Sequence, residues 1–257
     1  MKNNSILERM FWLLLLALLW QIIFWSEIFS PLVFPSLIKI GKTLLESLLT
    51  GQLREQLLFS LTIIMQGLLI SLLLALLLSF LAHFSEIAAS LIDTVVAIAH
   101  PLPGIALMPL VLIWFGAGRT AILFVIIHSV LWPMLLNLRT AFSSIPEIYN
   151  LVGKNYGLNR FERLIQVMAP ASLPYFLAGL KIGWARAWRA LISAEMLFGA
   201  ANSIGGLGWY IYQKRVFFDL PGVFAGIILI IIIGILVEDF IFNKIEKHTV
   251  NKWGMNL

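Results

Sequence analysis

Four ionisable side chains fall within one long apolar stretch of the sequence. Lys181 comes first, Arg186 and Arg189 follow three residues apart, and Glu195 comes six residues after the second arginine. A charged side chain at the centre of a membrane span costs about 2.5 to 3.5 kcal/mol on insertion scales, so these four cannot face lipid. We therefore expect this segment to turn its polar side toward other helices or toward a water-filled path.

The spacing of these residues divides them between two neighbouring sides of a helix. At about 100° per residue, Arg186, Arg189 and Ser193 share one side. Residues at intervals of seven occupy the adjoining side: Lys181, Trp188 and Glu195. Two arginines in a narrow, poorly screened channel create a positive potential that lowers the cost of carrying an anion. The first hypothesis is therefore a solute pathway formed by Arg186, Trp188, Arg189, Ser193 and Glu195.

A second hypothesis gives the same arginines a structural role. The two guanidinium groups then pair with Glu195, Asp93 or the carbonyls at helix ends, and only hold helices together. Lys181 is assigned to structure in both cases. It lies about two turns from the expected cytoplasmic end, so its ammonium can extend to the membrane surface. The sequence leaves both hypotheses open.

The composition places the chain in a lipid bilayer. Of its 257 residues, 60% are hydrophobic and only 12% are charged, which is too apolar for the surface of a soluble domain. Long Leu and Ile runs without alternation exclude a transmembrane barrel, so the predicted fold class is all-α and polytopic. The net charge of +5 comes mostly from short loops, where basic residues set topology, so we predict no nucleic-acid partner.

Windows of about 20 apolar residues predict six membrane-spanning helices. They lie near residues 10–29, 57–81, 91–115, 119–138, 173–197 and 222–242. Three prolines interrupt the third window: Pro101, Pro103 and Pro109. With the N-terminus inside, the inner segments hold nine Lys and Arg residues against six outside, which favours cytoplasmic N- and C-termini. The prediction is one membrane domain over residues 1–257, with 139–172 as its largest cytoplasmic segment.

Within this cytoplasmic segment, the pattern predicts two short helices joined at a glycine. Gly157 ends the first helix and Asn159 caps the second. The second helix then carries an apolar stripe formed by Phe161, Leu164, Ile165 and Met168. Such a helix pair either docks into a groove on another protein or lies on the inner leaflet, and its periodicity does not separate these possibilities.

The same segment resembles the EAA loop of permeases from binding-protein-dependent ABC importers. In that loop Glu-Ala-Ala is followed by three residues, Gly, nine residues and Ile-x-Leu-Pro, and Gly157, Val167 and Pro170 are in register with it. Leu151 to Gly153 replace Glu-Ala-Ala, and Ala169 replaces the Leu. Further motifs resemble the sulfonate, nitrate and taurine branch: 103–118 with Trp114 to Gly118, 171–181, Ala194 to Met196, Gly205 to Gly208, and a basic tail near Trp253.

The resemblance implies a permease in the bacterial cytoplasmic (inner) membrane that acts by alternating access. Its implied partners are a second copy of the chain, two ABC ATPase subunits and an extracytoplasmic solute-binding protein, and the sequence leaves a paralogous permease open in place of the second copy. The residues implied in ATPase coupling are Gly153, Tyr156, Gly157, Leu158, Arg160, Phe161, Val167 and Pro170. The resemblance spans permeases for nitrate, alkylsulfonates, taurine, bicarbonate and uncharged vitamin precursors, and the two arginines favour a small anion among them, such as a sulfonate, nitrate or taurine-like compound. Trp184 and Trp188 are expected to add apolar surface for an organic tail.

The sequence itself contains no complete nucleotide-binding motif. Gly41-Lys42-Thr43 approaches a P-loop, but Ser36 occupies the position of the required first glycine. We therefore expect no enzyme activity and no cofactor on this chain, with ATP and Mg²⁺ handled by the partner ATPase. Four scattered histidines, at 83, 100, 128 and 248, predict no metal site. Gly205 to Gly208 with Trp209 and Tyr210 predict an outer loop with an aromatic belt, and Pro221 predicts the start of the last helix.

Three other classes of protein compete with an ABC permease. The main one is a secondary transporter that binds its substrate or a coupling ion with Arg186, Arg189 and Glu195; such folds show paired broken helices, and this sequence has one broken span without a matching partner. An intramembrane enzyme has no supporting Gly-x-Ser-x-Gly, metal cluster or carboxylate pair. A scaffold subunit that transports nothing is compatible with the residues.

Overall fold

The computed structural model describes residues 2–143, 145–199 and 205–249, and every regular element in these ranges is helical. In chain order the elements are α1 (Lys2–Trp25), α2 (Leu37–Leu49), α3 (Gln52–Phe84), α4 (Glu86–Ala99), η1 (Gly104–Leu107), α5 (Met108–Phe115), α6 (Arg119–Ser143), α7 (Glu147–Asn155), α8 (Arg160–Arg163), η2 (Leu164–Met168), α9 (Ala169–Ala171), α10 (Leu173–Phe198), α11 (Leu207–Val216), α12 (Leu220–Ile235), η3 (Leu236–Phe242) and α13 (Asn243–His248). The all-α prediction is confirmed for these residues.

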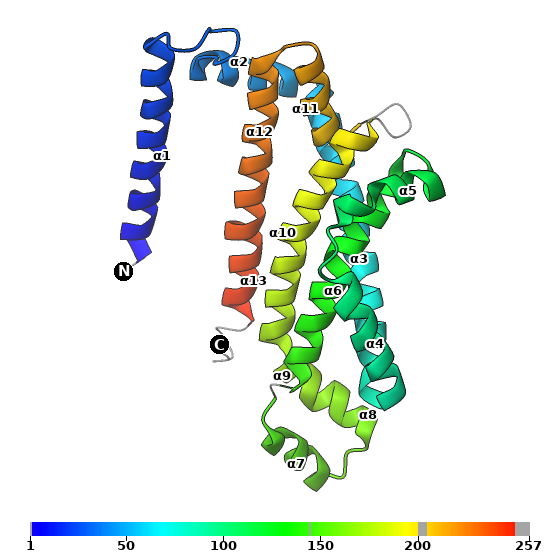
Figure 1. Ribbon diagram of the computed structural model, residues 1–257. Helices are drawn as coiled ribbons and strands as arrows, with labels where there is room; N and C mark the ends of the chain where they lie inside the picture. Colours follow the sequence, from blue (N-terminus) through cyan, green and yellow to red (C-terminus); the bar gives the residue numbers. More distant parts are fainter. Residues whose placement is uncertain (1, 144, 200–204, 250–257) are drawn as a thin grey trace.

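The long helices run roughly side by side, with α3, α6 and α10 at the centre (Figure 1). Two glycines allow the close approach of these three helices. A Cβ on Gly183 of α10 would lie 2.9 Å from Met134 of α6, and one on Gly67 of α3 would overlap Ile126 of α6. Small residues at helix crossings bring backbones together in membrane proteins, where packing rather than water exclusion drives association.

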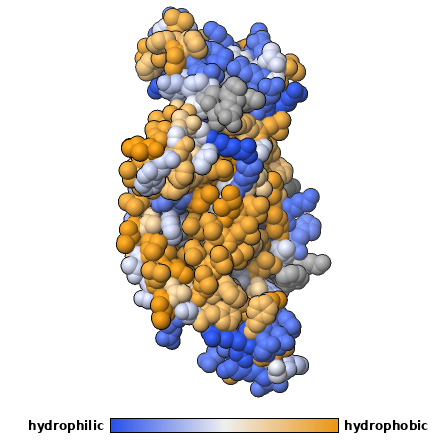
Figure 2. Space-filling view, turned by 90° about the vertical axis from the view of Figure 1, so that its right-hand side faces the viewer, coloured by the Kyte–Doolittle hydropathy of each residue, from blue (hydrophilic) through white to orange (hydrophobic). Residues whose placement is uncertain are grey.

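Among the residues that the structure describes, four helices are long and apolar enough to cross a membrane: Leu7–Trp25, Gln52–Phe84, Arg119–Ala141 and Leu220–His248. Two bent pairs raise this number to as many as six if each pair is one span. The apolar surface forms a broad band between hydrophilic ends (Figure 2). A band of this kind is the surface that lipid covers in a multi-pass membrane protein.

The third predicted span, 91–115, is not one helix. Its two halves, Glu86–Ala99 and Gly104–Phe115, meet at an angle of 85°. Pro101 and Pro103 lie in the break, and Pro103 is the residue before the 3₁₀ turn η1. Proline lacks a backbone donor and disfavours helix in the residue before it, so two prolines in three residues end α4. The break therefore lies deep inside the apolar part of the sequence.

Other helix bounds also differ from the predicted windows. The first helix ends at Trp25 rather than near residue 29, and Glu27 adopts a positive φ of 53°. Helix α6 continues to Ser143, so the loop predicted from residue 139 begins within that helix. The predicted outer loop at Gly205–Gly208 instead contains the start of α11, and Tyr210 is fully buried rather than part of a surface belt. The prediction that Pro221 starts the last helix is confirmed, because α12 begins at Leu220.

Helix α1 stands apart from the bundle (Figure 1), and its apolar window is unburied. At one end, Trp20 stacks on Phe34 with ring centroids 4.1 Å apart and meets the edge of Phe224 in α12. Near the other end, Arg9 pairs with Asp239 of η3 at 2.9 Å. Helix α1 is therefore attached at two points, and most of its apolar surface is free.

The segment between α6 and α10 projects from one end of the bundle, opposite α2 and α11 (Figure 1). Its first helix, α7, ends before Gly157, which has a positive φ of 73°. Asn159 then caps α8: its side-chain oxygen accepts from the N–H groups of Phe161 and Glu162, and the Glu162 carboxylate accepts from the Asn159 N–H. The predicted pair of short helices joined at a glycine is confirmed.

Candidate functional site

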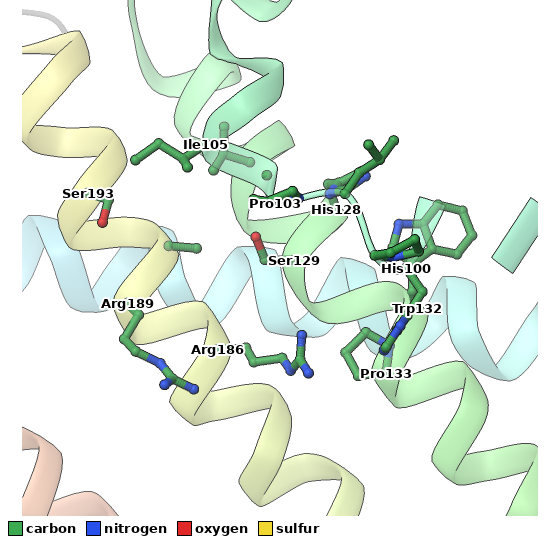
Figure 3. Close-up of a pocket in the computed structure, with 15 residues that line it drawn as sticks. His100, Pro103, Ile105, His128, Ser129, Trp132, Pro133, Arg186, Arg189 and Ser193 are labelled. Atoms are coloured by element: carbon green, nitrogen blue, oxygen red, sulfur yellow. The ribbon is translucent and has the colours of Figure 1, made fainter. Parts of the chain in front are cut away.

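A pocket of about 490 Å³ opens where the break between α4 and α5 meets α6 and α10. The pocket is lined by residues of all three segments (Figure 3): 100–105 from the break, Val125, His128, Ser129, Trp132 and Pro133 from α6, and Arg186, Arg189, Ala190 and Ser193 from α10. Three of the five residues predicted for a solute pathway, Arg186, Arg189 and Ser193, therefore lie together in one cavity.

The two arginines give the pocket its charge. Arg186 extends from α10 toward α6, while Arg189 stays close to its own helix (Figure 3). The Arg189 Nε donates to the Ala185 carbonyl oxygen at 3.0 Å, which leaves its terminal nitrogens for other partners. Neither guanidinium forms an ion pair with any acid in the described ranges. Arginine stays charged in proteins, so the pocket carries an uncompensated positive charge.

The acids proposed as partners for these arginines pair with other groups. Asp93 of α4 forms a salt bridge with Arg139 of α6. Lys181 lies 3.9 Å from Glu238 of η3. Glu195 accepts from Ser60 and from a backbone N–H. The hypothesis that Asp93 or Glu195 neutralises the pocket arginines is therefore wrong.

Two of the five predicted pathway residues lie away from the pocket. Trp188 stacks on Trp184 with ring centroids 5.6 Å apart, and both rings are buried in the core between helices. They do not supply the pocket's apolar surface, which comes instead from Leu102, Ile105 and Trp132. Glu195 is fully buried against α3 and α11. Helical spacing placed these side chains on the side adjoining the arginines, and that side faces neighbouring helices.

The α4–α5 break reaches the pocket because Gly104 lets it approach α6 closely. A Cβ on Gly104 would lie 2.6 Å from Ser129 Oγ and 3.2 Å from the Val125 carbonyl oxygen. His128 is brought to the same place and packs edge-on against Trp132, with centroids 6.1 Å apart. His100 and His128 thus share a pocket although they are 28 residues apart in sequence. No group of three or more metal-binding side chains occurs in the part of the chain that the structure describes.

The predicted coupling residues form a second site, at the α7–α8 end. Gly153 is buried under Arg163: a Cβ there would lie 2.9 Å from the Arg163 Cγ and 3.6 Å from Val167. Leu158 is half-buried at the joint, and Pro170 is exposed in α9. Tyr156 and Phe161 are exposed, at 81% and 54%. The loop thus combines a packed interior with aromatic rings that no other described residue covers.

Arg160 connects this loop to the bundle. Its guanidinium donates to the His83 carbonyl oxygen at 2.9 Å, and its Cζ lies 4.8 Å from the centre of the Phe84 ring. The His83 carbonyl and the Phe84 ring are both at the end of α3. The last carbonyls of a helix have no partner within the helix. A cation at this end also interacts favourably with the helix dipole. Arg160 therefore anchors α8 to α3.

Residues 67–250 match the family described as the binding-protein-dependent transport system inner membrane component. This range is most of the chain and includes the pocket and the α7–α8 loop. The chain belongs to this family of transport permeases. Family membership and the long apolar helices together show that the chain is a multi-pass membrane permease.

The permease is similar to several named transport permeases. It is 27% identical to the taurine transport system permease protein of Escherichia coli over 88% of this chain and 82% of the relative. It is 26% identical to the putative aliphatic sulfonates transport permease protein of Bacillus subtilis, over 91% and 83%. It is 29% identical to a putative ABC transporter permease protein of Methanocaldococcus jannaschii, over 74% and 70%. These proteins are transport subunits rather than enzymes.

Sequence reasoning missed several residues that the permease brings to these sites. Ser129, His128 and Pro133 join the arginines only because α6 packs against α10, and no spacing rule links segments so far apart. Ser60 joins Glu195 across 135 residues. The one available signal for Ser60 was its type, since a hydroxyl within an apolar span needs a partner.

Proposed function

We propose that this permease forms the solute path of an ABC import system and carries a small organic or inorganic anion across the cytoplasmic membrane. The observation that carries the anion assignment is the pocket that Arg186 and Arg189 both line without an acidic partner among the described residues. Opposite charge in a poorly screened cavity lowers the cost of moving an anion through a bilayer. The relatives named for taurine and for aliphatic sulfonates support the same solute class.

The size and lining of the pocket fit such a solute. Its volume of about 490 Å³ is within the range of roughly 300 to 1,000 Å³ that is usual for small-molecule sites. Arginine presents a planar array of donors that matches the oxygens of a sulfonate, carboxylate or nitrate group. Ser129 and Ser193 add hydroxyl donors, and Trp132 and Ile105 add apolar surface for a short organic tail.

The topology proposed here has six spans and cytoplasmic termini. The spans are α1, α3, the broken pair α4–α5, α6, α10 and α12 with its continuation, and they make one membrane domain over residues 1–257. The α7–α8 loop within 139–172 then lies in the cytoplasm, and α2 and α11 lie at the outer end. The basic residues of the inner segments support this orientation.

Transport is driven by a pair of ABC ATPase subunits on separate chains, and these subunits bind ATP and Mg²⁺. Exposed Tyr156 and Phe161 at the tip of the loop offer the apolar anchors that a groove on such a partner would take. A second copy of the permease completes the membrane unit, and a solute-binding protein delivers the anion to the outer end. ATPase closure draws the loops together and switches the pocket between inward and outward access.

The pocket assignment is tested in the complex of permease, ATPase and solute-binding protein, reconstituted in liposomes. Arg186→Gln and Arg189→Gln each remove one pocket charge, and we expect each to reduce ATP-driven uptake of taurine, alkylsulfonate or nitrate at least tenfold. Arg54→Gln is the matched control, because Arg54 is exposed at the start of α3, far along the chain from the pocket. Both pocket variants should still copurify with the ATPase. Normal uptake by both would show that the arginines do not line the path.

The alternative, a secondary transporter that uses Arg186, Arg189 and Glu195 together, has less support. Glu195 is fully buried and bound to Ser60 and Gly208, so it does not share the arginine pocket. A secondary transporter also has no need of an anchored helix pair that projects from the membrane. Uptake driven by an ion gradient in liposomes that contain the permease alone would favour this alternative.

A further inference from the structure

Glu195 is the one fully buried charged residue in the part of the chain that the structure describes, and it does not belong to the pocket. Ser60 Oγ of α3 donates to its carboxylate, 2.7 Å from Oε1 and 3.0 Å from Oε2. The backbone N–H of Gly208 donates to Oε2 at 2.9 Å, and that of Leu207 donates to Ser60 Oγ at 2.9 Å. We call these four groups the α11 latch. They join α3, α10 and the first turn of α11.

The latch requires glycines at the start of α11. A Cβ on Gly206 would overlap the Glu195 carboxylate and Ser60 Oγ, and one on Gly208 would overlap the Ile192 carbonyl oxygen. The first N–H groups of a helix have no partner within it, and a carboxylate placed there is favoured by the helix dipole. No basic side chain in the described ranges pairs with Glu195. The carboxylate is therefore satisfied by the latch donors, and α11 cannot move away without taking the Gly208 N–H from Glu195 and the Leu207 N–H from Ser60.

Helix α11 lies at the end of the bundle opposite the α7–α8 loop, residues 147–168, which we call the coupling loop (Figure 1). Its side chains Leu207, Tyr210 and Ile211 are buried. The Tyr210 hydroxyl lies 3.1 Å from Ser47 Oγ of α2, and Gly226 of α12 makes room for the Tyr210 ring. Helix α11 is therefore wedged among α2, α3, α10 and α12. With α11 seated, its buried side chains fill the space between these four helices.

One uninterrupted helix connects the latch to the coupling loop. Helix α3 runs from Gln52 to Phe84, with Ser60 near one end and His83 and Phe84 at the other (Figure 1). The 23 residues from Ser60 to His83 span about 35 Å at about 1.5 Å per residue. Arg160 of α8 holds the far end through the His83 carbonyl and the Phe84 ring. A displacement of α8 is therefore transmitted to Ser60 without passing through a flexible segment.

We propose that Ser60 and Glu195 are positioning residues that keep α11 seated as the outer gate, and that α3 carries the movement of the coupling loop to them through Arg160. The assignment of an outer end and of a coupling loop rests on the proposed function. Release of α11 requires the Leu207 N–H to leave Ser60 Oγ and the Gly208 N–H to leave the Glu195 carboxylate. The outer gate is thus connected through α3 to the coupling loop, which the ATPase moves.

The test uses the reconstituted complex of permease, ATPase and solute-binding protein, with a single reporter thiol at Ile211→Cys. The chain has no cysteine of its own, and Ile211 is 6% exposed in the seated helix. The rate of reaction with a membrane-impermeant maleimide added outside then reports the open fraction. Without nucleotide, Ser60→Ala should raise this rate about tenfold, which corresponds to about 1.4 kcal/mol. Glu195→Gln should act in the same direction.

Ser71→Ala is the matched control. Ser71 is on the same helix and fully buried, but its hydroxyl has no hydrogen-bond partner among the described residues. It should leave the labelling rate unchanged, so a general loosening of α3 is distinguished from loss of the latch. Equal labelling of Ser60→Ala and Ser71→Ala would overturn the latch. This comparison needs no ATP, so it tests the latch even if the complex fails to transport. Failure to transport would count against the proposed function and not against the latch.

The link through α3 has its own test in the same preparation. In the complex with an intact latch, ATP together with the loaded binding protein should accelerate labelling of the reporter. Arg160→Ala should abolish this acceleration while the ATPase remains attached, and Lys154→Ala, which removes an exposed charge from α7, should preserve it. Full acceleration in Arg160→Ala would show that α3 does not connect the loop to the gate.

Discussion

Gly104 and Ser129 line the pocket side by side, and they are so close that a Cβ on Gly104 would lie 2.6 Å from Ser129 Oγ. The same Cβ would lie 3.2 Å from the Val125 carbonyl oxygen, which cannot rotate away. This contact brings the break between α4 and α5 against α6. The shape of the pocket therefore depends on residue 104 being a glycine, which has no Cβ.

The first prediction concerns this contact. Gly104→Ala should destabilise the permease by about 1 to 3 kcal/mol, the usual cost of overpacking, and should lower uptake by displacing the break. Thermal unfolding in detergent and uptake in liposomes measure the two effects. Adding Ser129→Ala should recover part of the stability by making room for the methyl group. Gly41→Ala is the control, because a Cβ there meets no other atom within 4 Å. Equal unfolding temperatures for Gly104→Ala and Gly41→Ala would contradict the packing argument.

The second prediction concerns the joint of the coupling loop. Gly157 has a φ of 73°, a conformation that costs a residue with a side chain about 1 to 2 kcal/mol. Open space surrounds the position where its Cβ would lie, so the effect of Gly157→Ala should come from the backbone alone. We expect weaker copurification of the ATPase with little change in the unfolding temperature of the bundle. Unchanged ATPase affinity would show that the angle at Gly157 is not needed for docking.

The third prediction separates the exposed and buried sides of the loop. Phe161→Ala should reduce ATPase binding and leave the unfolding temperature of the isolated permease unchanged, because the ring is 54% exposed. Leu164→Ala, in the next turn, removes a buried side chain and should lower stability by about 2 to 5 kcal/mol. Binding assays and thermal unfolding on the two variants measure the contrast. If Phe161→Ala destabilised the isolated chain as much as Leu164→Ala, the exposed ring would not be a docking residue.

The fourth prediction concerns the turn between α11 and α12, where the Lys214 Nζ donates to the Asp219 carboxylate at 2.8 Å. Partial burial opposes both charges. The hydrogen bond and the charge of the partner outweigh it, so the pKa of Lys214 is raised and, with help from the Gly222 N–H, the pKa of Asp219 is lowered. An acid whose pKa is lowered by folding stabilises the native state at pH values above the pKa that the acid has in the unfolded chain. A lysine whose pKa is raised by folding stabilises the native state at pH values below the pKa that the lysine has in the unfolded chain.

This pair should therefore stabilise the permease across neutral pH and fail at both extremes. The contribution of Asp219 should be lost as the pH falls below its usual pKa of 3.8 and through the native one. That of Lys214 should be lost as the pH rises above 10.5 and through its native pKa. Asp219→Asn should lower the unfolding temperature at pH 7, and its difference from the wild type should shrink in acid. A difference that is constant with pH would show that the charge pair contributes nothing.

Most of the architecture was predictable because it depends on composition. Apolar runs of about 20 residues determine where helices can cross a membrane, and Gly157, Asn159 and Pro221 mark helix ends by local rules. The 85° break after Ala99 was signalled by its prolines, but its angle depends on how Gly104 packs against α6. The placement of α11 as a buried helix was not predictable from Gly205 to Gly208, since glycines indicate a loop as readily as a close approach.

The candidate site was predictable only in part, for a similar reason. Helical periodicity grouped Arg186, Arg189 and Ser193 correctly, because all three are on one helix. It could not say what the adjoining side of α10 faces, and there the structure places Glu195 against Ser60 rather than in the pocket. A partner 135 residues away is determined by packing, and packing is not visible in the spacing of a single segment.

We expect the permease to move solute only when a separate ATPase drives it. The most direct measurement is uptake of labelled taurine, alkylsulfonate and nitrate into liposomes that contain the permease, with the ATPase and the binding protein present or left out. We predict ATP-dependent accumulation of one of these solutes in the complete system and none with the permease alone. Accumulation by the permease alone, under an ion gradient and without any nucleotide-hydrolysing subunit, would contradict the account.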